Sequence, residues 1–448
     1  EAFTYMIDRR RRLGGSVPER RTRAAALPLP PKETYDVVRR GSGKQPIATT
    51  MAFVRLLKDL MRDKGIGAHF VPIIPDEART FGMDSLFPTA KIYNPGGQQY
   101  TSVDRELVLN YQEAADGQIL HEGINEAGSV ASFIAAGSSY STHGIPMIPV
   151  YIFYSMFGFQ RTGDAFWQAM DQMTRGFVLG ATAGRTTLNG EGLQHEDGHS
   201  MLLASTNPAA VAYDPAYGYE IGHIVGDGLR RMYGEHPEDV FYYLTVYNEP
   251  YPQPVEPADV DVDGILRGMH LVCAGGGDQA KPQILASGVA VNWALDAQRL
   301  LKDDWGVESD VWSITSWNEL RREALDVDRW NFLNPLEEPR VAYVTERLRN
   351  RGGLTVGVSD WMTAVQDQVR TWIPGDYFTL GTDGWGMSDT RGALRRHFLV
   401  DAESITVRTL TGLAGQGLVP RQDLAKAIER YRLLDPGAAD AGNTEGSG

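Results

Sequence analysis

Cysteine is almost absent from this sequence: Cys273 is the only one in 448 residues, which excludes an intrachain disulfide. No apolar run reaches the roughly eighteen residues that a membrane-spanning helix needs, and the first residues lack the pattern of a signal peptide. Positive charge is outnumbered by negative charge, and the net charge of −14 disfavours a general nucleic-acid-binding surface. Together these absences predict a cytoplasmic, globular protein without a membrane or nucleic-acid partner.

What the sequence does contain is a regular alternation of strand and helix patterns. Apolar runs at 69–74, 147–153 and 241–246 predict buried parallel strands, with helical patterns between them. This alternation is typical of an α/β fold in which helices cover both faces of a parallel sheet. A segment rich in proline and acidic residues, 250–262, predicts a domain boundary, after which the alternation starts again. We expect an arm at 1–45, an α/β domain at 46–255, a second α/β domain at 265–435 and a flexible, linker-like tail at 436–448.

One glycine-rich run, Asn189–His199, supports two incompatible interpretations. Its last five residues fit the H-E-x-x-H pattern of zinc peptidases, in which both histidines must lie on one face of a helix. Gly190, Gly192 and Gly198 each cost up to about 1 kcal/mol in a helix interior, and no apolar stripe is present to bury one helix face. The sequence therefore favours an active-site loop that presents imidazoles and carboxylates to a substrate.

Other motifs join this loop in a recognisable order. They are Pro75–Met83, Glu122–Glu126, Tyr154–Arg161, Ser316–Leu320 and Gly381–Asp389. With the loop, they resemble the E1 component of the bacterial pyruvate dehydrogenase complex, of the homodimeric, thiamine-diphosphate-dependent type. Members of that family are longer, and the match is to their C-terminal half, so the chain is either a natural split subunit or a fragment. The resemblance implies two α/β domains with parallel or mixed sheets: a pyrimidine-binding domain of the thiamin-diphosphate-binding fold and a transketolase C-terminal-like domain.

The resemblance also implies which residues hold the cofactor, thiamine diphosphate. Such an enzyme needs a carboxylate at N1′ of the aminopyrimidine, and Glu126 matches it; the residues alone leave an ordinary glutamate at a helix N-terminus equally open. Phe157 matches the ring that stacks on the pyrimidine, although an aromatic cluster is more often core. Tyr154 matches a residue near the aminopyrimidine, and Ile124 is assigned to the same pocket.

Further residues are expected on the substrate side. His195 matches a histidine of the family that donates to a substrate carboxylate or moves a proton, work that suits an imidazole near neutral pH. His199 is expected to support the loop. Asp76 and Glu77 follow a predicted strand and resemble the family's active-site acidic pair, though either could be a helix cap. The segment 96–111 matches a mobile loop over the bound cofactor.

The part that would bind the diphosphate is missing from the sequence. Thiamine enzymes hold Mg²⁺ and the diphosphate through Gly-Asp-Gly followed by a pair of asparagines. Gly226–Gly228 has the first element, but only Asn248 follows, and the segment continues as a helical pattern. We therefore predict no metal ligand in this chain and expect the Mg²⁺ ligands on a second E1-like chain, in an α₂β₂ assembly.

Three functions remain open from the sequence. The first is a subunit of an E1-type 2-oxo acid dehydrogenase, with pyruvate as the expected substrate, that transfers a two-carbon acyl unit to a lipoyl group on an E2 component. The second is a split E1- or transketolase-like enzyme that moves a glycolyl unit from a ketose phosphate to an acyl carrier protein. The third is a non-catalytic assembly subunit that has kept the fold.

Overall fold

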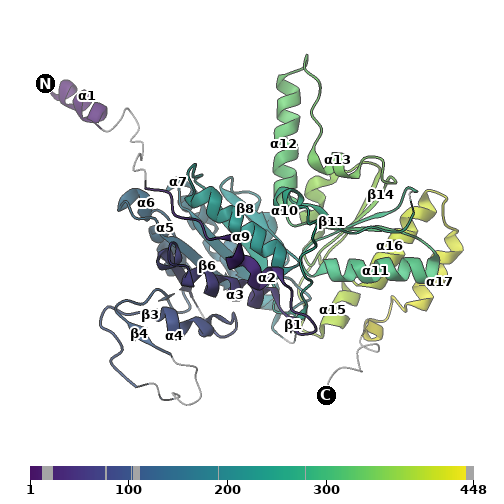
Figure 1. Ribbon diagram of the computed structural model, residues 1–448. Helices are drawn as coiled ribbons and strands as arrows, with labels where there is room; N and C mark the ends of the chain where they lie inside the picture. The colour runs from purple at the N-terminus through teal and green to yellow at the C-terminus, as the bar shows by residue number, and fades with distance from the viewer. Residues whose placement is uncertain are drawn as a thin grey trace.

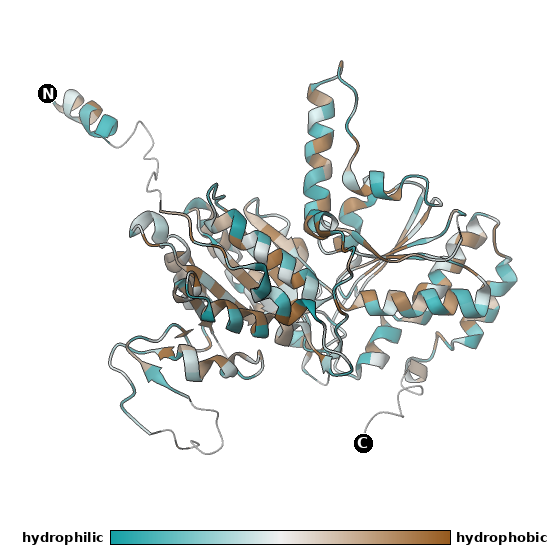
Figure 2. Cartoon of the chain, in the orientation of Figure 1, coloured by the Kyte–Doolittle hydropathy of each residue, from teal (hydrophilic) through white to brown (hydrophobic). Residues whose placement is uncertain are grey.

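The computed structural model consists of two α/β lobes that follow one another along the chain (Figure 1). It describes residues 1–12, 24–75, 78–101, 103, 111–189, 191–277 and 279–439. Within these ranges, no helix combines the length and the apolar character needed to cross a bilayer. Figure 2 shows apolar residues gathered on the strands of both lobes, whereas the helices alternate between polar and apolar positions.

The first lobe is built on a six-stranded sheet in which the strand pairs are parallel. In order across the sheet, the strands are β5 (Leu120–His121), β2 (Phe70–Ile74), β6 (Ile148–Tyr154), β7 (Gly176–Ala181), β9 (Phe241–Val246) and β8 (Ala210–Tyr213). The central strands β6, β7 and β9 are apolar and buried along nearly their whole length, as strands between two layers of helices must be. The predicted parallel strands are therefore confirmed.

Helices α3 (Thr49–Arg62) and α9 (Gly218–Tyr233) pack against each other and against β9. A second pair, α5 (Glu126–Gly137) and α7 (Gly158–Asp171), packs together, and α5 lies on β6. Buried apolar residues recur every three or four positions along α3, which is the pattern of an amphipathic helix on a core. These two pairs cover the sheet that carries the site.

A short N-terminal segment completes this lobe. The 3₁₀ turn η1 (Lys32–Tyr35) and helix α2 (Asp36–Arg39) pack on α3, and α2 also packs on α9. The contact with α9 is close because a Cβ atom added at Gly218 would lie 3.1 Å from the Val38 carbonyl oxygen. Residues 32–39 are thus part of the packed lobe. Upstream of them, helix α1 (Ala2–Arg12) buries no residue.

The second lobe has a mixed five-stranded sheet. Its strands, in spatial order, are β11 (His270–Cys273), β13 (Asp310–Ser313), β12 (Gln283–Ala286), β14 (Leu354–Val358) and β15 (Asp376–Leu380). The β11–β13 pair is antiparallel and the other pairs are parallel, so the predicted α/β class holds for both lobes. Helices α11 (Ala290–Trp305) and α16 (Ala402–Gly415) pack together, and α16 contacts β14.

The lobes meet across buried polar side chains. Asp214, which follows β8, is fully buried and accepts hydrogen bonds from Thr245 Oγ1 (2.7 Å) and Tyr247 OH (2.6 Å) of its own lobe. From the second lobe, Ser287 Oγ (2.7 Å) and Trp361 Nε1 (2.8 Å) donate to the same carboxylate. Burial raises the pKa of Asp214, and these donors offset part of the rise. One buried carboxyl group at the interface therefore accepts hydrogen bonds from both lobes.

Candidate active site

Three of the predicted site residues meet at the carboxyl edge of the first sheet. Tyr154 is the last residue of β6, Phe157 ends the 3₁₀ turn η4 (Ser155–Phe157), and His195 ends a second turn, η5 (Leu193–His195), in the loop after β7. Because β6 and β7 are parallel neighbours, their carboxyl ends lie side by side. The centre of the His195 ring lies 5.1 Å from that of Tyr154 and 5.2 Å from that of Phe157. These three rings form an aromatic cluster.

Glu126, the predicted carboxylate, is linked to this cluster by an arginine. It is the first residue of α5, whose N-cap Asn125 accepts a hydrogen bond from Gly128 N (3.0 Å). Only 12% of the Glu126 side chain is exposed, and its Oε1 accepts a 2.9 Å hydrogen bond from Arg161 Nη1. The guanidinium carbon of Arg161 lies 3.9 Å from the centre of the Phe157 ring. One planar cation thus contacts both the carboxylate and the aromatic ring.

The His195 imidazole has a ring nitrogen, Nδ1, whose hydrogen-bonding capacity is unused in the described structure. Its Nδ1 is buried and has no hydrogen-bond partner among the residues that the structure describes. The nearest acidic group is Glu191, whose Oε2 lies 3.7 Å from this nitrogen. Because a buried imidazole nitrogen without a partner is costly, the geometry suits a histidine that gains a partner when a ligand binds.

The loop that carries His195 is not helical, which argues against the zinc interpretation. His195 ends a 3₁₀ turn, and His199 is the N-cap of α8 (Ser200–Ala204) with φ −147° and ψ −2°. Between them, the buried Asp197 accepts hydrogen bonds at Oδ1 from the backbone N–H of His199 and of Ser200, each 3.0 Å long. Over the described ranges, no three His, Cys, Asp or Glu side chains are grouped as metal ligands. The two histidines therefore do not share a helix face.

A cavity of about 670 Å³ lies beside the aromatic cluster and is lined by both lobes. From the first lobe, Phe157, Arg161 and His199 are among its lining residues. From the second lobe come residues 384–386, and Trp385 in this segment is 84% exposed. A ligand that reached Phe157 through this cavity would touch both lobes.

Arg185, which the sequence did not single out, holds the second lobe against this cavity, and Glu196, which the sequence offered only as the glutamate of the H-E-x-x-H pattern, packs against the same loop. Arg185 Nη1 donates to the carbonyl oxygens of Thr382 (2.6 Å) and Gly384. Glu196 is 1% exposed, and burial raises its pKa to about 7. A Cβ atom at Gly386 would lie 2.0 Å from Glu196 Oε2, so the second-lobe loop fits only without a side chain there. No local sequence pattern could have revealed these contacts, because their partners lie almost two hundred residues away.

The cluster does not account for all of the predicted site residues. Asp76 and Glu77 lie outside the described residues. Ile124 is described, and it is 76% exposed. Of the predicted mobile loop, residues 102 and 104–110 lie outside the described part, while Tyr111 OH donates to Glu113 Oε1 (2.9 Å). Their assignments remain predictions from the family resemblance.

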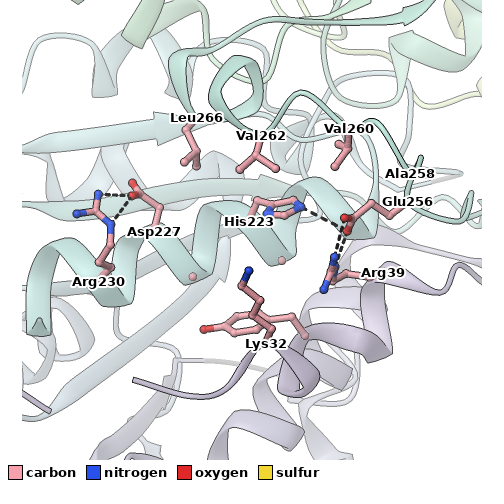
Figure 3. A pocket seen from close by; sticks show the side chains of 13 residues that line it. Lys32, Arg39, His223, Asp227, Arg230, Glu256, Ala258, Val260, Val262 and Leu266 are labelled. Carbon is pink, nitrogen blue, oxygen red and sulfur yellow. Dashed lines mark hydrogen bonds and ion pairs between the residues drawn. The ribbon is translucent and has the colours of Figure 1, made fainter. Parts of the chain in front are cut away.

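The Gly-Asp-Gly segment is accounted for by the packing of α9 against its own lobe. Asp227 accepts hydrogen bonds from Arg230 Nη2 (2.6 Å) and Tyr242 OH (2.6 Å), and Figure 3 shows the Arg230 contact. A Cβ atom at Gly228 would lie 2.7 Å from the Phe177 ring, whereas Gly226 faces Tyr35. The segment borders a separate cavity of about 490 Å³ whose lining shares no residue with the cavity beside Phe157 (Figure 3).

Comparison with known proteins matches both lobes. A family model described as the pyruvate dehydrogenase E1 component middle domain matches residues 27–254, and one described as the transketolase-like C-terminal domain matches residues 268–401. The pyruvate dehydrogenase E1 component of Mycolicibacterium smegmatis is 61% identical over 436 residues, which are 97% of this chain and 47% of that protein. The Escherichia coli K12 protein of the same name is 47% identical over 435 residues, 97% of this chain and 49% of its own length. The chain thus spans about half the length of these curated relatives.

Solved structures show the same fold at low identity. Transketolase from Campylobacter jejuni matches with a TM-score of 0.62 and 16% identity, over 84% of this chain and 49% of that one. A split-gene transketolase described as an inactive β4 tetramer matches with a TM-score of 0.53 and 15% identity, over 82% of this chain and 98% of that one. At such identities the likeness shows the fold alone, and this fold is transketolase-like.

Proposed function

Because the chain belongs to the family of pyruvate dehydrogenase E1 components, we propose that it forms the aminopyrimidine side of a thiamine diphosphate site. The enzyme would decarboxylate a 2-oxo acid, with pyruvate as the expected substrate, and pass the two-carbon unit to a lipoyl or carrier domain. The observation that carries the proposal is the meeting of Glu126, Phe157, Tyr154 and His195 at one edge of the sheet.

The side chains at this edge of the sheet fit an aminopyrimidine. The ring of such a ligand is planar and needs an apolar face, and its N1′ needs a carboxylate. Phe157 offers the face and Glu126 the carboxylate, at a spacing that the guanidinium of Arg161 already spans. A flat, nitrogen-rich group therefore matches both contacts.

Each residue then has a defined task. Bound thiamine diphosphate supplies the electron sink for the carbanion that decarboxylation leaves. Glu126, whose side chain is only 12% exposed, would hold and exchange a proton at N1′. His195 would donate to the substrate carboxylate or move a proton, and its buried Nδ1, which has no partner among the described residues, would gain one when the ligand binds. Tyr154 would orient the imidazole through the ring contact it already makes.

The diphosphate side of the cofactor is proposed to lie on polypeptide outside this chain. Mg²⁺ requires several oxygen ligands, and within the described residues no acidic group of this kind is assembled. Asp227 already accepts hydrogen bonds from Arg230 of α9 and from Tyr242 of β9. We therefore propose a second chain that carries the diphosphate-binding domain, in an α₂β₂ assembly.

Reconstitution tests this proposal. The chain would be mixed with the N-terminal half of the 61% identical relative from Mycolicibacterium smegmatis, and binding of thiamine diphosphate with Mg²⁺ would be followed by calorimetry. We expect tight, Mg²⁺-dependent binding by the mixture and weak binding by either part, because a ligand held at an interface stabilises only the assembled state. Decarboxylation of pyruvate, with consumption of a ketose phosphate as the comparison, would then identify the substrate.

Two outcomes would contradict the proposal. Micromolar, Mg²⁺-dependent binding by the chain alone would show that it holds its own diphosphate site. If mixtures made with the Glu126→Ala or Phe157→Ala chain bind the cofactor as tightly as the mixture made with the parent chain, these residues do not line the pyrimidine pocket.

A further inference from the structure

We infer that Arg161 is a built-in occupant of the subsite formed by Glu126 and Phe157, and that an aminopyrimidine ligand binds there by displacing it. The guanidinium is planar, stacks 3.9 Å from the centre of the Phe157 ring, and donates a 2.9 Å hydrogen bond to Glu126 Oε1. These are the two contacts that an aminopyrimidine would need, so the cation and the ligand compete for the same positions. The inference rests on the proposed function of this subsite.

The occupied state has a physical advantage for the free protein. Without Arg161, the Glu126 carboxylate, only 12% exposed, would face an aromatic ring with no cation beside it. A charge in that position is costly unless it is paired. Arg161 thus keeps carboxylate and ring in place until a ligand takes over both contacts.

The backbone around Arg161 permits it to leave. The next residue, Thr162, has φ −132° and ψ 21°, which are not helical values, so α7 is kinked immediately after the arginine. Thr162 Oγ1 donates to the Gly158 carbonyl oxygen (2.7 Å), a bond that often bends a helix. Arg161 therefore lies on a single turn between η4 and the kink, and its movement does not require the rest of α7 to move.

There is also room for the displaced side chain. Arg161 lines the cavity of about 670 Å³, and 49% of its side chain is exposed. Water can therefore solvate the guanidinium once it leaves, and a ligand that supplies both of its contacts can replace it. Once released, the guanidinium is a cation at the mouth of the site, beside His199 and Gln160 in the lining of the same cavity.

The test uses the full chain and 4-amino-5-hydroxymethyl-2-methylpyrimidine, an aminopyrimidine that carries no diphosphate. Arg161→Met removes the cation but keeps an apolar chain, and we expect it to bind the probe about five- to tenfold more tightly than the parent. Arg230→Met is the matched control, because Arg230 also forms an ion pair on this lobe, with Asp227, but away from the cavity. It should bind the probe like the parent.

Glu126→Ala and Phe157→Ala separate failure of this inference from failure of the proposed function. If both weaken probe binding while Arg161→Met binds the probe no better than the parent, the subsite stands and the displacement by ligand is overturned. If neither variant changes probe binding, the proposed pyrimidine subsite is itself overturned, and the inference falls with it.

A second measurement does not depend on affinity. The NMR signal of the Arg161 Nε–H group should be shifted by the Phe157 ring current in the free chain and should lose this shift in Phe157→Leu. Addition of the probe to the parent should move the signal towards the position seen in that variant. A signal that keeps its ring-current shift in the probe-saturated chain would overturn the inference.

Discussion

At the scale of single residues, the fold has withdrawn several carboxyl groups from water. Glu126 keeps a cation as its partner, whereas Asp360, after β14 in the second lobe, is buried completely. Both oxygens of Asp360 lie 3.1 Å from the backbone nitrogen of Thr186 in the first lobe. Burial raises the pKa of Asp360 to about 7, and Arg395 offsets part of the effect.

Glu126→Gln should abolish turnover of the reconstituted enzyme and leave the fold intact. An amide cannot exchange a proton with N1′ as a carboxylate can, so we expect a loss of at least about 10²–10⁴-fold in kcat. The hydrogen bond from Arg161 can still be accepted by the amide oxygen, so the midpoint of urea unfolding should change little. Turnover within tenfold of the parent would contradict the assignment of this residue.

Asp360→Asn should change how stability depends on pH. Because the pKa of about 7 in the folded protein exceeds the ordinary value of 3.8, the folded state holds the proton more tightly than the unfolded state does. The contribution of Asp360 to stability is therefore present at low pH, falls as pH rises from about 4 to 7, and is constant above that. Asparagine does not titrate, so the free energy of unfolding of the variant does not fall in this way. Relative to that of the parent, it should rise by about 2–4 kcal/mol between pH 4 and pH 8.

Urea unfolding at several pH values measures this gain. The exposed Asp259→Asn serves as the control, and its curve should run parallel to that of the parent. A parallel curve for Asp360→Asn as well would show that burial does not shift the pKa of Asp360.

At the scale of elements, strands could be predicted and contacts between loops could not. The runs that form β6 and β9 are almost entirely aliphatic or aromatic, so burial between helices is their straightforward interpretation. Glu126 and Phe157 could be assigned only through the family resemblance, because a glutamate at a helix start and an aromatic in a cluster both have ordinary structural explanations. Arg161 belongs to one of the motifs that carry the resemblance, but the sequence assigns it no role. Its partner Glu126 lies 35 positions earlier in the chain, so no local pattern connects the two residues.

Gly386→Ala should loosen the loop of the second lobe from the cavity wall. The added Cβ would lie 2.0 Å from Glu196 Oε2, so either the loop or the buried glutamate must move. Overpacking of this kind costs about 1–3 kcal/mol, which thermal unfolding can measure. Gly415→Ala, at the end of α16 where a Cβ meets nothing within 4 Å, is the matched control and should not lower stability. Equal melting temperatures for the two variants would argue against the tight fit at Glu196.

At the scale of the whole molecule, the two lobes are joined by hydrogen bonds between polar side chains and backbone groups of one lobe and those of the other. Asp214 takes donors from both lobes, and Arg185 reaches backbone carbonyls of the second lobe. The cavity beside Phe157 has walls from both lobes, so its shape depends on these contacts. Stability of the interface and geometry of the site are therefore coupled.

Asp214→Ala should weaken this coupling. The substitution leaves buried donors on Tyr247, Ser287 and Trp361 without an acceptor, at a cost of at least about 3 kcal/mol. Calorimetry should show a lower melting temperature and a transition that separates into two, one for each lobe. Asp214→Asn keeps an acceptor oxygen and should be milder. A single transition at the parent's temperature in Asp214→Ala would show that this carboxyl group does not join the lobes.

The exposure of Trp385 has an optical consequence. The chain has nine tryptophans, and Trp312, Trp317 and Trp361 are fully buried, whereas the indole of Trp385 is 84% exposed at the rim of the cavity. Its fluorescence emission should be shifted to the red by contact with water and should be quenched by iodide. Whatever covers the cavity mouth will shift this emission to the blue and shield it from the quencher. The protein thus has an intrinsic fluorescent reporter of closure that requires neither a label nor turnover.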